Sequence, residues 1–125
     1  MTGAKVTACS TCRFDGEARE DADGVRGGRH LVAALTALAA EEPHYAGIAV
    51  ESVACLWACA EHCVVNLQAP GKVGYIAGRF APDAEAARAI LDFAVGYAAS
   101  EDGGVPYRDW PEGVKGHFIA RTPAG

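Results

Sequence analysis

IAVESVACLWACAEHC, residues 48–63, joins a short β-branched run to three cysteines. Residues 48–53 are rich in valine and isoleucine, which predicts a strand that ends just before Cys55. A second run of strand-forming residues, residues 5–8, leads directly into the sequence CSTC at residues 9–12. The sequence therefore predicts two strands that each end at a cysteine cluster.

A helix is predicted between these two strands. Leu31, Leu35 and Leu38 repeat at helical spacing in an alanine-rich stretch that stops at Pro43. A strand–helix–strand crossover of this length makes neighbouring parallel strands, whose carboxyl ends emerge at the same edge of the sheet. We therefore expect the two cysteine clusters to converge in space.

The remaining sequence predicts a hairpin, a second helix and a tail. Residues 64–68 and 73–77 resemble strands and flank a Pro-Gly turn, and residues 82–100 carry apolar side chains at helical spacing. The order β-α-β-β-β-α predicts an α/β fold with a mixed sheet and two helices. We expect one domain over residues 1–104, with residues 105–125 as an extended tail that packs on the same domain.

Composition limits the class of protein. A chain of 125 residues with 50% hydrophobic residues suffices for one core, and its net charge of -5 provides no basic surface for nucleic acid or anionic lipid. No apolar stretch approaches the roughly 20 residues that cross a bilayer, and the N-terminus lacks a secretory signal. We therefore expect no nucleic-acid or membrane partner, and a cytoplasmic location that keeps the thiols reduced.

The cysteines are the candidate site residues. They form the patterns C-x2-C and C-x3-C-x3-C, and they are Cys9, Cys12, Cys55, Cys59 and Cys63. An odd number of cysteines in a reducing compartment indicates metal or redox chemistry, and soft thiolates suit both Zn²⁺ and iron–sulfur clusters. The interval between the patterns holds a whole helix and strand, which favours a cluster over a zinc ribbon.

Two resemblances extend this interpretation. The element order, with C-L-x-x-C at residues 55–59, resembles the thioredoxin-like [2Fe-2S] ferredoxins and the related cluster subunit of respiratory complex I. Over nearly its whole length the chain is similar to the domain-of-unknown-function family DUF1636, described as predicted metal-binding proteins and linked to cobalamin biosynthesis or cobalt handling. That similarity includes residues 9–12, 55–63, 103–106 and 120–123.

The ferredoxin resemblance implies a fold, a cofactor and a function. The fold would be a truncated thioredoxin-like ferredoxin fold, and the function would be electron transport to a redox partner protein rather than catalysis. Position by position, the ligands of a [2Fe-2S] cluster would be Cys9, Cys12, Cys55 and Cys59. The ferredoxins also tend to pair, which implies a homodimer. Cys63 departs from their pattern, and it would be a replacement ligand, a ligand to another metal, or a buried apolar residue.

Two other hypotheses use the same thiolates. A cobalt or zinc delivery protein would add Cys63 or His62 and would pass its metal to an accepting enzyme, whereas a structural zinc site would only stabilise the fold. A thioredoxin-type oxidoreductase would explain residues 9–12. However, such an enzyme needs a helix at its first cysteine, where this chain has a glycine-rich acidic loop, and no cis-proline candidate lies between Pro43 and Pro70.

Three histidines and the aromatic residues of the tail are expected to have structural roles. His30, His44 and His117 have no ligand spacing to the cysteines. Three aromatic residues of the tail are expected to cover the sheet or a partner surface; they are Tyr107, Trp110 and Phe118.

Overall fold

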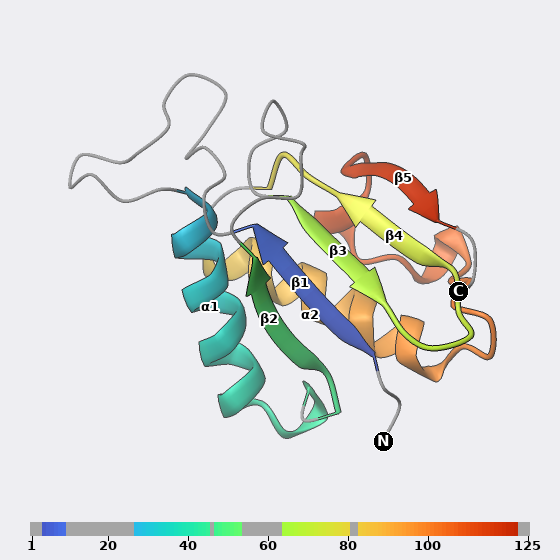
Figure 1. Cartoon of the computed structure of the whole chain (residues 1–125), viewed down its shortest axis with the longest axis horizontal. Coiled ribbons are helices and arrows are strands. Elements are labelled where there is room, and N and C mark those ends of the chain that lie inside the picture. The colour runs from blue at the N-terminus through green and yellow to red at the C-terminus, as the bar shows by residue number, and fades with distance from the viewer. Residues whose placement is uncertain (1–3, 10–26, 46, 54–63, 81–82, 123–125) are drawn as a thin grey trace.

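The computed structural model describes residues 4–9, 27–45, 47–53, 64–80 and 83–122. These residues form a five-stranded sheet with two α-helices (Figure 1). In chain order the elements are β1 (Lys5–Cys9), α1 (Gly27–Glu41), η1 (Pro43–Tyr45), β2 (Ala49–Val53), β3 (Val65–Gln68), β4 (Gly74–Ala77), α2 (Ala84–Ala99), η2 (Tyr107–Asp109), η3 (Glu112–Val114) and β5 (Phe118–Thr122).

The predicted crossover is present. β1 and β2 pair in parallel, in a register that runs from Lys5 opposite Ala49 to Cys9 opposite Val53. α1 connects the two strands along the chain and packs against both of them. The prediction that the two strands are parallel neighbours is confirmed.

The other strands extend the sheet on the far side of β1. The strand order is β2-β1-β3-β4-β5, and β3 runs antiparallel to both β1 and β4. The predicted hairpin is confirmed, with its turn closed by the Lys72 N–H, which donates to the Ala69 carbonyl at 3.2 Å. The α/β class with a mixed sheet and two helices is also confirmed. β5 is a strand that we did not predict, and it pairs antiparallel with β4.

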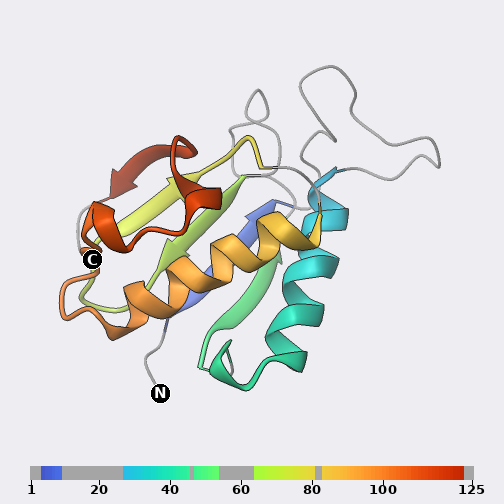
Figure 2. The same cartoon turned by 180° about the vertical axis from the view of Figure 1, so that it is seen from behind.

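Both helices cover the same face of the sheet, as the view from behind shows (Figure 2). The three leucines predicted to face the core of α1 are buried, and so are the apolar residues of α2 at helical spacing; the latter are Ala87, Ile90, Leu91 and Ala94. Polar side chains follow the opposite face of the central strands, namely Lys5, Thr7, Asn66 and Gln68. The core therefore lies between one sheet face and two helices.

Both ends of α2 have hydrogen-bond partners outside the helix. At its start, the Asp83 carboxylate accepts a hydrogen bond from the Ala86 N–H at 2.9 Å, which is the role of an N-cap residue. At its end, the Lys72 ammonium donates to the carbonyls of Tyr97 and Ala98 at 3.2 and 2.6 Å. Because the last carbonyls of a helix lack partners within it, Lys72 both satisfies them and attaches the hairpin to the helix.

Because of Tyr45, the stability of the fold is expected to fall as the pH rises through the alkaline range. Its side chain is fully buried and its hydroxyl donates to the Asp92 carboxylate, and burial followed by this contact raises the pKa of Tyr45 from 10.0 to about 12. Below pH 10 the hydroxyl is protonated in both the folded and the unfolded state, so its full contribution to the free energy of unfolding is present. Between pH 10 and about 12 only the unfolded state ionises, and the free energy of unfolding falls by about 3 kcal/mol in total.

Urea unfolding at about pH 9 and about pH 11 checks this expectation. The wild-type protein should lose clearly more stability between these pH values than Tyr45→Phe, which has no hydroxyl to ionise. An equal loss in both proteins would show that Tyr45 does not carry the dependence.

Candidate metal centre

The ends of three strands meet at one edge of the sheet. Parallel pairing places Cys9 opposite Val53, and each is the last residue of its strand. β3 starts at the same edge, because it runs antiparallel to β1 with Val65 opposite Ala8. We call this edge, marked by Cys9, Val53 and Val64, the cysteine edge. It is the edge at which the arrowheads of β1 and β2 lie in Figure 1.

The cysteine edge is where the chain enters and leaves the segment with three of the cysteines. β2 ends at Val53, two residues before Cys55, and Val64 follows Cys63 directly. The prediction that both strands end at one edge is confirmed. The convergence of the cysteines themselves stays a prediction, because Cys12, Cys55, Cys59 and Cys63 lie outside the described residues, as do His62 and Trp57. Within the described ranges, no three His, Cys, Asp or Glu side chains are grouped to hold a metal ion.

The amino end of α1 also lies near the cysteine edge. The helix begins at Gly27, beside the arrowheads of β1 and β2 (Figure 1). Its first turn contains Arg29 and His30 and no acidic residue. The unpaired N–H groups at a helix start carry a partial positive charge, to which the exposed Arg29 guanidinium adds. Both contributions, from the helix start and from Arg29, favour an anionic group placed close to the first turn of α1.

His117 lies just before β5, and its environment is structural. Its ring stacks on Phe80 with centroids 4.5 Å apart, and its Nδ1 is 3.0 Å from the Gly78 carbonyl oxygen. The His117 carbonyl in turn accepts a hydrogen bond from the Gly78 N–H at 2.9 Å. These contacts fix the connection between β4 and β5 and give the Nδ1 atom of His117 a hydrogen-bond partner.

The sequence profile of the DUF1636 family, described as a protein of unknown function, matches residues 6–124. The chain belongs to the DUF1636 family. No curated protein and no solved structure matches it. The DUF1636 match covers both cysteine clusters and every described element beyond the start of β1. Among the described helices of this DUF1636 protein, none is long and apolar enough to cross a membrane.

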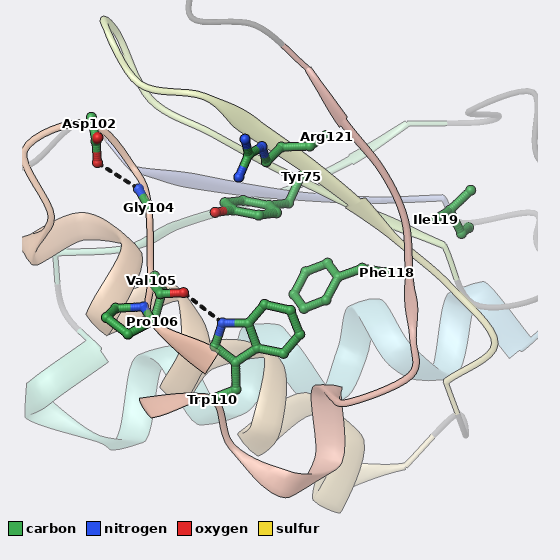
Figure 3. A pocket seen from close by; sticks show the side chains of 9 residues that line it. All are labelled: Tyr75, Asp102, Gly104, Val105, Pro106, Trp110, Phe118, Ile119 and Arg121. Carbon is green, nitrogen blue, oxygen red and sulfur yellow. Dashed lines mark hydrogen bonds between the residues drawn. The ribbon is translucent and has the colours of Figure 1, made fainter. Parts of the chain in front are cut away.

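A second feature, a cavity of about 570 Å³, lies beside β4 and β5, on the far side of β3 from β1 and β2 (Figure 3). Three aromatic residues of the tail are predicted to cover the sheet or a partner surface. Trp110 and Phe118 are partly buried against the core, whereas Tyr107 is 63% exposed. The sequence analysis missed three other residues that line the cavity, namely Tyr75, Asp102 and Arg121. The pairing of β4 with β5 places Tyr75 opposite Arg121, and the hydrogen bond from the Val73 N–H to the Asp102 carbonyl places Asp102 beside the start of β4; no sequence pattern shows either contact.

Proposed function

We propose that this DUF1636 protein is a small iron–sulfur electron carrier. It binds one [2Fe-2S] cluster through Cys9, Cys12, Cys55 and Cys59 and passes single electrons to a partner protein. The observation that supports this most is the parallel pairing of β1 and β2 through Cys9 and Val53. The first cluster of cysteines starts at one of these strand ends, and the second starts two residues after the other. Four thiolates from two such segments are a ligand set for a cluster.

The charge near the cysteine edge supports an anionic cofactor. A [2Fe-2S] cluster with four thiolates has a net charge of about -2 in its oxidised form, which the protein must offset with donors and positive potential. The amino end of α1 and the Arg29 guanidinium supply such a potential. The cluster would contribute the one-electron chemistry, while the chain holds it and presents it to the partner.

A mononuclear cobalt or zinc centre is the second candidate, and the position of Val64 favours it. Val64 is buried, lies next to Cys63 in the sequence, and precedes the residue that pairs with Ala8. The chain therefore returns beside the end of β1 directly after Cys63. This makes Cys63 a further candidate ligand, in addition to the other four cysteines. Such a centre would suit metal delivery to an accepting enzyme. A place in cobalt or cobalamin metabolism rests on the family resemblance.

Metal and sulfide analysis of protein purified without air separates the two candidates. The electron carrier should be reddish, absorb at roughly 400–600 nm and contain iron and acid-labile sulfide in equal amounts. Dithionite should bleach this absorption, and air should restore it. Zinc or cobalt without sulfide would reject the electron carrier and support the mononuclear centre.

A further inference from the structure

The cavity beside β4 and β5 has the size of a small-molecule site. Its volume of about 570 Å³ lies within the range of about 300 to 1,000 Å³ that ligand pockets occupy. Its walls come from β4, from β5 and from the segment between α2 and β5. β5 supplies three of the lining residues, and β3 and β4 lie between it and β1 in the sheet, so the cavity is separate from the proposed metal centre.

Aromatic rings form the apolar walls of the cavity. The ring of Phe118 lies 4.8 Å from that of Trp110 and 5.3 Å from that of Tyr75, measured between centroids. The Trp110 indole N–H donates to the Val105 carbonyl at 2.8 Å, which holds the indole in place (Figure 3). Rings that are already fixed bind a planar apolar group at little conformational cost.

The Tyr75 hydroxyl is a buried donor without a partner among the described residues. Tyr75 is 5% exposed and lines the cavity, and its ring packs against the rings of Phe93, Tyr97 and Phe118. The other two fully buried tyrosines differ, because the Tyr97 hydroxyl donates to the Val73 carbonyl at 2.7 Å and the Tyr45 hydroxyl donates to Asp92. Because the Tyr75 hydroxyl lines the cavity and has no acceptor among the described residues, it can donate a hydrogen bond to an acceptor atom of a ligand there.

Two oppositely charged side chains, Asp102 and Arg121, lie at the rim of the cavity, and of these two only Asp102 has a direct hydrogen-bond partner among the described residues. The Asp102 carboxylate accepts hydrogen bonds from the Gly104 N–H at 2.8 Å and the Ser100 hydroxyl at 3.1 Å. The Gly104 N–H, followed by Ser100, holds the pKa of Asp102 below its ordinary value of 3.8. The exposed Arg121 guanidinium has no ion pair or hydrogen bond within the described ranges. The charge of Arg121 contributes, as the last of the causes, to the lowered pKa of Asp102, but its guanidinium is not held in an ion pair and can still pair with an acid group of a ligand.

We infer that this cavity binds a small planar molecule that carries an acid group. Its ring system contacts Trp110 and Phe118, one of its acceptor atoms accepts a hydrogen bond from the Tyr75 hydroxyl, and its carboxylate or phosphate pairs with Arg121. Figure 3 shows the Tyr75 ring between Arg121 on one side and the two apolar rings on the other. This site requires no metal and stands independently of the electron-transfer proposal.

Titration with 2-naphthoate tests the assignment, with neutral 2-naphthamide as the matched probe. The full-length protein should bind 2-naphthoate, shifting the NMR signal of the Trp110 indole N–H, and should bind 2-naphthamide more weakly. Arg121→Gln should weaken the binding of 2-naphthoate roughly tenfold, the effect of one charge-assisted hydrogen bond, and leave that of 2-naphthamide unchanged. Absence of binding, equal affinity for both probes, or an unaffected Arg121→Gln variant would overturn the inference.

Two tyrosine variants separate a binding role of Tyr75 from a structural one. Tyr75→Phe should weaken the binding of 2-naphthoate while leaving the thermal midpoint unchanged or higher, because no hydrogen bond within the protein is lost. Tyr97→Phe should lower the midpoint, because it loses the bond to Val73. An equal drop in midpoint for both variants would show that the Tyr75 hydroxyl serves the fold, and would contradict its assignment to a ligand.

Discussion

Replacing Cys59 with serine should remove most of the visible absorption of this protein, together with most of its bound iron and sulfide. The proposed cluster needs four deprotonated soft sulfur ligands. A serine hydroxyl is a harder ligand and stays protonated at neutral pH, so the substitution removes one of the four bonds to the protein. Absorption spectra and iron and sulfide analysis of the purified variant measure the loss.

Cys63→Ser is the matched control, because it makes the same change of sulfur to oxygen four residues later in the chain. In the electron carrier it should leave the absorption and the iron content close to those of the wild type. The opposite pattern, with a colourless Cys63→Ser and an unchanged Cys59→Ser, would replace Cys59 by Cys63 in the ligand set. Loss of zinc or cobalt in both variants, without any sulfide in the wild type, would point to the mononuclear centre.

The cysteine edge could be predicted because its determinants are local. β-branched runs next to the cysteines define the ends of β1 and β2, and a crossover of fixed length orients them in parallel. β5 is different. Its sequence, FIART, contains the strand formers Phe, Ile and Thr, but it follows two short 3-10 helices in a segment with several prolines and has no neighbouring element along the chain to pair with. Its partner is β4, more than 40 residues earlier, and this long-range pairing could not be predicted from the local sequence.

The chemistry of the two candidate sites was predictable to different degrees. Cysteine spacing identifies candidate thiolate ligands, but thiolate chemistry is shared by zinc and iron–sulfur centres, so the spacing does not select the metal. The binding role assigned to the cavity depends on which tyrosine hydroxyl has no hydrogen-bond partner among the described residues. Tyr75 and Tyr97 differ in this respect although both lie in apolar surroundings, and only the position of the Val73 carbonyl distinguishes them. Such a difference has no counterpart in the sequence pattern.

Gly103→Ala should lower the free energy of unfolding by about 2 to 5 kcal/mol, since two costs act at this one position. Gly103 has φ of +88°, a backbone conformation that disfavours a side chain. A Cβ atom there would also lie 2.8 Å from Tyr97 Cε1 and 3.0 Å from the Val73 carbonyl oxygen. Neither atom yields easily, because the Tyr97 hydroxyl is bonded to that same carbonyl. Urea denaturation gives the value.

Two further glycines separate these costs. Gly71 has φ of +73° with no atom near its added Cβ, so Gly71→Ala should cost about 1 kcal/mol from backbone strain alone. Gly113 has no positive φ, but its added Cβ would lie 2.5 Å from the Ala89 Cβ on α2, so Gly113→Ala should cost about 1 to 3 kcal/mol from overpacking alone. Gly103→Ala should exceed both. A cost no larger than that of Gly71→Ala would mean that the chain is not closely packed at Gly103.

The Gly103→Ala variant is also expected to affect ligand binding in the cavity. Gly103 lies between Asp102 and Gly104, which both line the cavity, and its N–H donates to the Ser100 hydroxyl at 3.1 Å. Moving this segment away from Tyr97 therefore displaces one wall, and Gly103→Ala should weaken the binding of 2-naphthoate at a temperature where the variant is still folded. Its metal and sulfide content should match the wild type, because the cysteine edge lies toward the opposite end of β4. A parallel loss of metal would contradict the separation of the two sites.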